Sequence, residues 1–182
     1  LVRAGDLALI QGSADWLGIN YYTPFRTARA DADLPPHPEI GAYPGIAPLS
    51  FVVREPITDI GWEVDARGLE ELLLDTYQRT GLPLMITENG AAYADALRVE
   101  RDGVQVVDDQ DRIAYLGDHF AAAERARAAG VDLRGFFVWT LLDNFEWAEG
   151  YTKTFGLVHI DPVDQTRTPK ASYHWLADRL AR

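Results

Sequence analysis

The chain has 182 residues, of which 47% are hydrophobic and 25% charged, a composition typical of a folded globular protein. Its formal net charge of -11 argues against binding to nucleic acid or to anionic membrane surfaces, because both select for basic patches. The sequence contains no cysteine, which excludes disulfide bonds and thiolate zinc sites, and no apolar run is long enough for a membrane span.

The first predicted element is a strand in the stretch DWLGINYYT, residues 15–23. A long irregular region follows, because seven of the ten prolines lie between Pro24 and Pro56. A loop of this length inside a compact domain is usually functional or disordered. We expect residues 30–60 to form a long proline-rich loop on the side of the domain that carries the functional site.

Two helices and two more strands follow. Residues 68–81 predict a helix with leucines on one face and Gly81 at its end. The stretch LPLMITENG, residues 82–90, predicts a short buried strand. A second helix is expected over residues 108–130, where acidic residues crowd the first turn. The stretch RGFFVWTLLDNFEW, residues 134–147, predicts a strand covered on both faces, because nearly every position is apolar.

The stretch TPKASYHWLADRL predicts a closing helix, with Thr168 as its N-cap and Pro169 in its first position. The element order is therefore strand, long loop, helix, strand, helix, strand, helix, which indicates parallel β/α units. Three such units form either an open sheet or part of a barrel. Both architectures keep their chemistry at the carboxyl ends of the strands.

The end of the second predicted strand carries the first candidate group. Glu88 follows the apolar residues 84–86, and a carboxylate at the edge of a buried strand is either well paired or placed for chemistry. The stretch TENG alone is about equally consistent with two roles for Glu88. It could be a structural carboxylate that caps a helix or pairs with an arginine, or a catalytic carboxylate held ionised by hydrogen bonds from Tyr22 and Asn89. A lone tyrosine such as Tyr22 is more commonly a core residue with an outward hydroxyl.

A second candidate group follows the last predicted strand. Trp139 ends an apolar run, Glu146 and Trp147 come next, and Phe155 lies shortly after them. Aromatic rings beside a carboxylate are typical of a sugar site, because the rings stack on the apolar face of a pyranose and the carboxylate accepts hydrogen bonds from its hydroxyls. Singly, each residue is better explained as core or as a solvated charge, but the whole set with Glu88 favours a sugar site.

Three stretches, LGINYYT, ITENG and GFFVWTLLDNFEWAEGYTKTFGLVHID, resemble the last third of glycoside hydrolase family 1, the β-glucosidase family. The resemblance covers nearly the whole chain. It implies an α/β fold, the C-terminal part (about strands 6–8) of a TIM (β/α)8 barrel. It also implies a retaining β-glycosidase of the β-glucosidase type, which hydrolyses terminal non-reducing β-D-glucosyl residues through a covalent glycosyl-enzyme. Small β-glucosides or oligosaccharides would be its substrates.

The resemblance further implies roles for individual residues. Glu88 matches the catalytic nucleophile, and Tyr22 matches the tyrosine that orients it. The positions that match sugar-binding residues are Asn20, Trp139, Glu146, Trp147 and Phe155. An unphosphorylated sugar is favoured, because a carboxylate at position 146 would repel a phosphate.

The sequence gives no support for a metal or a cofactor. The four histidines are scattered without the spacing of metal ligands. No glycine-rich phosphate loop follows any predicted strand, which disfavours an unrelated doubly wound nucleotide-binding protein. We therefore expect neither a metal nor a cofactor.

One half of the expected chemistry is absent from the chain. A retaining glycosidase needs two carboxylates about 5–5.5 Å apart, and the family's acid/base lies in a Thr-x-Asn-Glu-Pro motif that this sequence lacks. Glu55 precedes a proline but lies in the proline-rich loop, and we expect it at the surface. A full barrel typically needs about 250 residues. Residues 1–182 are therefore expected to be a C-terminal fragment of a single barrel.

This expectation shapes the remaining predictions. The isolated chain should be inactive or impaired, and the N-terminal part of the barrel is an expected partner. The alternative function is a non-catalytic carbohydrate-binding remnant. A cytoplasmic location is the default expectation, although any targeting segment would precede Leu1. Preference among sugar epimers and aglycones stays open.

Overall fold

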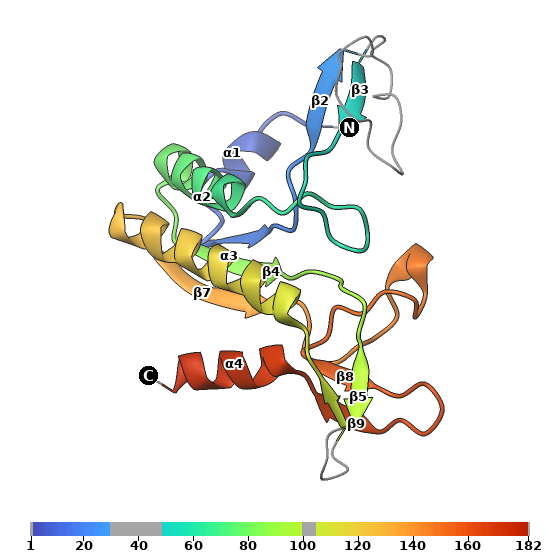
Figure 1. Cartoon of the computed structure of the whole chain (residues 1–182). Coiled ribbons are helices and arrows are strands. Elements are labelled where there is room, and N and C mark those ends of the chain that lie inside the picture. Colours follow the sequence, from blue (N-terminus) through green and yellow to red (C-terminus); the bar gives the residue numbers. More distant parts are fainter. Residues whose placement is uncertain (1, 30–48, 100–104, 182) are drawn as a thin grey trace.

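The structure is a computed structural model that describes residues 2–29, 49–99 and 105–181 (Figure 1). Its centre is a three-stranded parallel sheet in the order β1–β4–β7, formed by Leu17–Asn20, Leu84–Asn89 and Leu133–Val138. Three longer helices alternate with these strands along the chain: α2 (Ala66–Thr80), α3 (Gln110–Ala128) and α4 (Ala171–Leu180). The prediction of three parallel β/α units is confirmed.

Short elements flank the sheet. They are a helix α1 (Asp6–Ile10), a single 3₁₀ turn η1 (Trp147–Glu149) and three antiparallel strand pairs, β2 (Arg26–Arg29) with β3 (Leu49–Val52), β5 (Leu97–Val99) with β6 (Gln105–Val107), and β8 (Val158–Ile160) with β9 (Arg167–Pro169). The sequence did not predict these pairs. Of the expected loop over 30–60, residues 30–48 lie outside the described residues, and β3 lies in the remainder. No helix in the described ranges is long and apolar enough to cross a membrane.

One face of the sheet packs against α2 and α3. Leu73 of α2, Ile86 of β4 and Ala126 of α3 belong to one buried cluster, and each is fully shielded from solvent. The alanines of α3 let it approach α2 closely, because they add little side-chain bulk between the two helices. At the ends of α2, the side chain of Asp65 accepts a hydrogen bond from the Gly68 backbone, and Gly81 adopts a left-handed φ of 64°.

The opposite face of the sheet is open in the described part of the chain. Phe137 points to this face and is 56% exposed, whereas its neighbour Phe136 packs against the helix side. The prediction that the last strand is covered on both faces is therefore wrong for these residues. Its length was also overestimated, because β7 ends at Val138 and an irregular segment follows.

The last helix begins later than predicted. Thr168 lies in β9, where it pairs with His159 across the two strands, and Lys170 takes the N-cap position of α4. The backbone N–H of Lys170 donates to the carbonyl of Leu157 at 2.9 Å, so the chain is still tied to the residue before β8 just before the helix starts. This tie explains why Thr168 and Pro169 are extended rather than helical.

Candidate active site

Glu88 and Tyr22 meet at the carboxyl ends of two adjacent parallel strands. Asn20 of β1 lies opposite Glu88 of β4 in the register, next to an irregularity that shifts the pairing. The Tyr22 hydroxyl donates a 2.7 Å hydrogen bond to Oε2 of Glu88. Burial, followed by this hydrogen bond, raises the pKa of Tyr22 above its ordinary value, so the hydroxyl remains a donor. The predicted contact between these two side chains is present.

Tyr22 is held in place through its backbone. The hydroxyl of Tyr115 on α3 donates to the Tyr22 carbonyl at 2.9 Å. The side-chain amide of Asn89 donates to the Tyr21 carbonyl at 2.8 Å and to the Tyr115 hydroxyl at 3.2 Å. The expectation that Asn89 donates a hydrogen bond to Glu88 is therefore wrong, because its amide donates to the two tyrosines instead. Asn89 follows Glu88 on the strand, so its side chain points to the other face and fixes the tyrosines.

Aromatic rings surround the Tyr22 side chain. Its ring centroid lies 5.3 Å from that of Trp62 and 6.1 Å from that of Phe155, both in edge-on arrangements. Trp139 packs against the same cluster. Phe155 is 2% exposed, so it lines the base of the site from within the core.

Trp62 is a site residue that the sequence analysis missed. It lies in the segment between the proline-rich loop and α2, and a 2.8 Å hydrogen bond from the Thr58 backbone to the Trp62 carbonyl closes the turn that presents it. The only available signal was a single large aromatic residue close to the helix start. That signal does not distinguish a site residue from a core residue.

Glu146 is a second carboxylate near Glu88. The indole N–H of Trp139 donates to Oε1 of Glu146 at 3.1 Å. Burial raises the pKa of Glu146, the Trp139 hydrogen bond opposes this, and the negative charges of Asp143 and Glu88 raise it further. The segment after β7 thus brings Trp139 and Glu146 together and places Glu146 within electrostatic reach of Glu88.

The remaining two predicted residues lie at the margin of this group. Asn20 accepts a 2.6 Å hydrogen bond from the Thr87 hydroxyl on the open face of the sheet. Trp147 begins η1 and is 84% exposed, so the structure does not bring it into contact with the other predicted residues. Glu55 is exposed, as expected for a surface loop residue.

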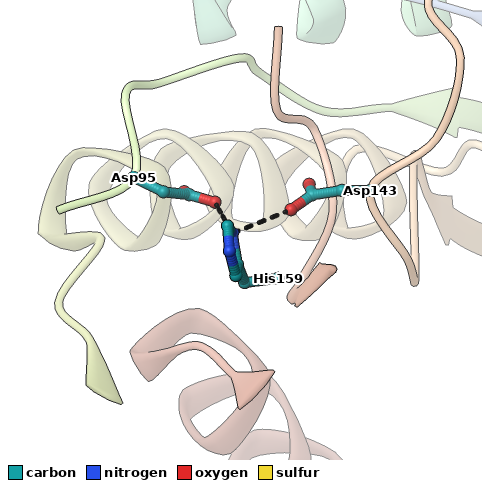
Figure 2. A group of neighbouring side chains, drawn as sticks. All are labelled: Asp95, Asp143 and His159. Atoms are coloured by element: carbon teal, nitrogen blue, oxygen red, sulfur yellow. Dashed lines mark hydrogen bonds and ion pairs between the residues drawn. The ribbon is translucent and has the colours of Figure 1, made fainter. Parts of the chain in front are cut away.

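The strongest candidate for a metal centre among the described residues is Asp95, Asp143 and His159, whose ligand atoms lie within 4.8 Å of one another (Figure 2). The sequence analysis did not anticipate this group, because its members are far apart in the chain. However, the ammonium of Lys170 lies 2.7 Å from Oδ2 of Asp95 and 3.0 Å from Oδ1 of Asp143. This buried cation already compensates the carboxylates, so the group does not fit a metal site.

The arrangement is therefore a parallel β/α sheet with one carboxylate at a strand end and a second in the segment after the last strand, both among aromatic rings. Residues 1–182 match the family model described as glycosyl hydrolase family 1, and the chain belongs to that family. It is 42% identical over 187 residues to a bifunctional beta-D-glucosidase/beta-D-fucosidase from Bifidobacterium breve, covering 98% of this chain and 40% of the relative. It is 44% identical over 176 residues to a beta-glucosidase from an Agrobacterium species, covering 96% and 36%.

Solved structures agree with this assignment. A family 1 b-glucosidase from Thermotoga maritima superposes with a TM-score of 0.81 at 39% identity, covering 97% of this chain and 36% of that one. The AHE enzyme from Alicyclobacillus herbarius gives 0.82 at 41% identity, covering 99% and 37%. The chain thus spans less than half the length of these relatives, and its three-stranded sheet corresponds to part of their TIM barrel.

Proposed function

We propose that this chain supplies the nucleophile and the sugar subsite of a retaining β-glycosidase of the β-glucosidase type. The observation that carries the proposal is the 2.7 Å hydrogen bond from Tyr22 to Glu88 at neighbouring strand ends. A barrel enzyme places its reacting groups at these ends. Terminal non-reducing β-D-glucosyl residues of small glucosides or oligosaccharides are the proposed substrates.

Glu88 is the proposed nucleophile. Tyr22 holds Oε2, which leaves Oε1 to attack the anomeric carbon. The bond from that carbon to the glycosidic oxygen breaks, and the leaving oxygen takes a proton from an acid/base carboxyl to give an alcohol. Water, deprotonated by the same acid/base, then cleaves the glycosyl ester and regenerates the Glu88 carboxylate. The acid/base is proposed to come from outside residues 1–182.

The sugar subsite is proposed to lie between Glu88 and the segment after β7. The face of Trp139 stacks on the apolar side of the ring, and Glu146 accepts hydrogen bonds from two hydroxyls. The Trp139–Glu146 hydrogen bond of 3.1 Å fixes the carboxylate for this task. Trp147, Asn20 and Phe155 are proposed to complete the subsite, with the exposed Trp147 moving onto the bound sugar.

The relatives support this proposal. The relative from Bifidobacterium breve is named a bifunctional beta-D-glucosidase/beta-D-fucosidase, and the relative from Agrobacterium is named a beta-glucosidase. The Thermotoga maritima enzyme has been solved with sugar-like compounds, among them deoxynojirimycin and castanospermine. A site that binds such compounds in a relative at 39–40% identity supports a glycoside as the ligand here.

A substrate with a good leaving group tests the proposal in this chain. A 4-nitrophenyl β-glucoside needs little protonation to leave, so it should glycosylate Glu88 without the acid/base. We expect one equivalent of nitrophenol to be released rapidly and further release to be slow. Glu88→Gln should abolish the release, whereas Glu71→Gln, on the exposed side of α2, should not change it. Sugar binding without any release would instead favour the non-catalytic carbohydrate-binding alternative.

A further inference from the structure

Asp143 closes the segment that carries much of the proposed sugar subsite. Its Oδ1 accepts a 2.7 Å hydrogen bond from the Gly156 backbone, and its own backbone N–H donates to Val158 at 3.1 Å. A side chain at position 156 would collide with this closure, since a Cβ there would lie 2.6 Å from Oδ1 of Asp143. The Asp143 carboxylate therefore holds together the two ends of residues 143–156, the segment that includes Glu146.

A second segment, residues 90–95, leads away from Glu88 and reaches the same place. Asp95 at its end is 4% exposed in its side chain and lies 2.7 Å from the Lys170 ammonium through Oδ2. Lys170 itself is completely buried and also donates to Asp143 at 3.0 Å. One ammonium thus joins the segment after the Glu88 strand to the segment that carries Glu146.

Two further side chains reinforce this junction. Arg112, which is 1% exposed, donates to the Ala91 carbonyl at 3.2 Å and to the Thr154 carbonyl at 2.6 Å, so it ties the same two segments together. His159 lies with Nδ1 3.1 Å from Asp95 and 3.6 Å from Asp143 (Figure 2). The junction is therefore built from several segments, with Lys170 between its two carboxylates.

We propose that Lys170 is a positioning residue: by joining Asp95 to Asp143, it sets the place of Glu146 relative to Glu88. The expected effect on sugar binding rests on the proposed function, because Lys170 itself does not touch the proposed sugar site. Without the ammonium, no permanently charged group would bridge the two buried carboxylates, because the Arg112 guanidinium lies beside Asp95 alone, at 3.7 Å. Oδ1 of Asp95 and Oδ2 of Asp143 already lack a hydrogen-bond partner among the described residues, and of the neighbouring groups only the His159 ring lies close to both carboxylates, at 3.1 and 3.6 Å. The two segments should then separate.

The test substitutes Lys170→Met in the 182-residue chain and follows labelling of Glu88 by a 2-deoxy-2-fluoro-β-glucosyl fluoride. We expect the half-saturating reagent concentration to rise about tenfold, because a small misplacement of a binding group is costly. The maximal labelling rate should change less than about threefold, because the Tyr22–Glu88 pair is untouched. The proposal would be overturned if the half-saturating concentration stayed unchanged, or if the maximal labelling rate fell by the same factor as that concentration rose.

Amide hydrogen exchange gives a readout that does not depend on sugar chemistry. In Lys170→Met, exchange should become about tenfold faster in peptides from residues 143–156 and stay unchanged in α2. If the unmodified chain shows no labelling, the proposed function fails, and this measurement alone decides the role of Lys170. Exchange within twofold of the unmodified chain in residues 143–156 would refute it.

Two variants separate positioning from general stability. Leu73→Ala removes a fully buried side chain of α2 outside the junction, so its exchange should rise in the core and not selectively in residues 143–156. Asp143→Asn keeps the side-chain shape and should reproduce the Lys170→Met effects in weaker form, which decides the matter if Lys170→Met does not fold. Stoichiometric binding of zinc chloride that Asp143→Asn abolishes would overturn the proposal, because a metal would then hold the carboxylates.

Discussion

Tyr22 and Glu88 show how a residue pair 66 positions apart in the chain becomes a single chemical unit. The parallel register brings their strand ends together, and Tyr115 and Asn89 fix the tyrosine from behind. The pair itself could be predicted from the sequence, because both residues follow strand-forming runs. The support could not, since Asn89 was expected to contact Glu88 and instead points to the opposite face.

The Tyr22→Phe variant tests the contribution of this hydrogen bond. A hydrogen bond to a charged group contributes about 1.5–3 kcal/mol, so its loss should slow labelling of Glu88 about 10- to 150-fold. The measurement is the labelling rate by mass spectrometry. Tyr151→Phe is the matched control, because Tyr151 is 76% exposed and its loss should leave the rate unchanged. Equal rates for Tyr22→Phe and the unmodified chain would show that the hydrogen bond is dispensable.

At the scale of elements, α3 carries polar residues on its inner side that its apolar pattern did not reveal. Arg112, Tyr115 and His119 are each 1% exposed or less. Their spacing of three or four residues puts them on the face that meets α2, the sheet and the segment after β4. Sequence periodicity identifies inward-pointing residues only when they are apolar. It therefore predicted a smaller buried face for α3 than the structure shows.

His119 makes the stability of the chain sensitive to acid. Its Nδ1 lies 2.7 Å from the Tyr115 carbonyl, which assigns the proton of the neutral ring to Nδ1, and Nε2 has no partner among the described residues. Burial lowers the pKa of His119 to about 4 from 6.5. Between these values the unfolded chain takes up a proton that the folded chain does not, so stability falls as the pH falls.

The expected loss is about 3 kcal/mol in the free energy of unfolding between about pH 6.5 and 4. His119→Asn can keep the hydrogen bond to Tyr115 but cannot take up a proton, so this part of the pH dependence should disappear. Urea titrations at a series of pH values measure it. Gln78→Asn is the control, since Gln78 is exposed on α2 and carries no titratable group, so the slope should stay unchanged. An unaltered slope in His119→Asn would contradict the assignment.

At the scale of the whole molecule, the described residues form a sheet that is covered on one face only. The sequence predicted the order and type of the three units, because their strands are continuous apolar runs and their helices have clear periodicity. It could not predict which face of β7 would stay open, because both faces of that run are apolar. It also could not predict the ion pairs of Lys170 or the position of Trp62 in the site, because both arise from tertiary contacts that leave no local sequence pattern.

Phe136 and Phe137 provide a direct test of this one-sided sheet. Phe136 stacks on Phe120 with ring centroids 4.2 Å apart, so Phe136→Ala should cost about 3 kcal/mol or more in stability. Phe137→Ser should leave the stability nearly unchanged and reduce self-association, because it removes a ring that is 56% exposed. Melting temperatures and sedimentation velocity measure the two effects. A large loss of stability in Phe137→Ser would mean that this face is covered.

The central claim is that Glu88 is a nucleophile in a site that this chain assembles, and covalent labelling tests it most directly. The folded chain is incubated with a 2-deoxy-2-fluoro-β-glucosyl fluoride, and its intact mass and peptides are then measured. The account predicts a single fluoroglucosyl adduct, with loss of fluoride, on the peptide that contains Glu88, and no adduct in Glu88→Gln. An adduct on another carboxylate, or none on a folded and soluble chain, would contradict it.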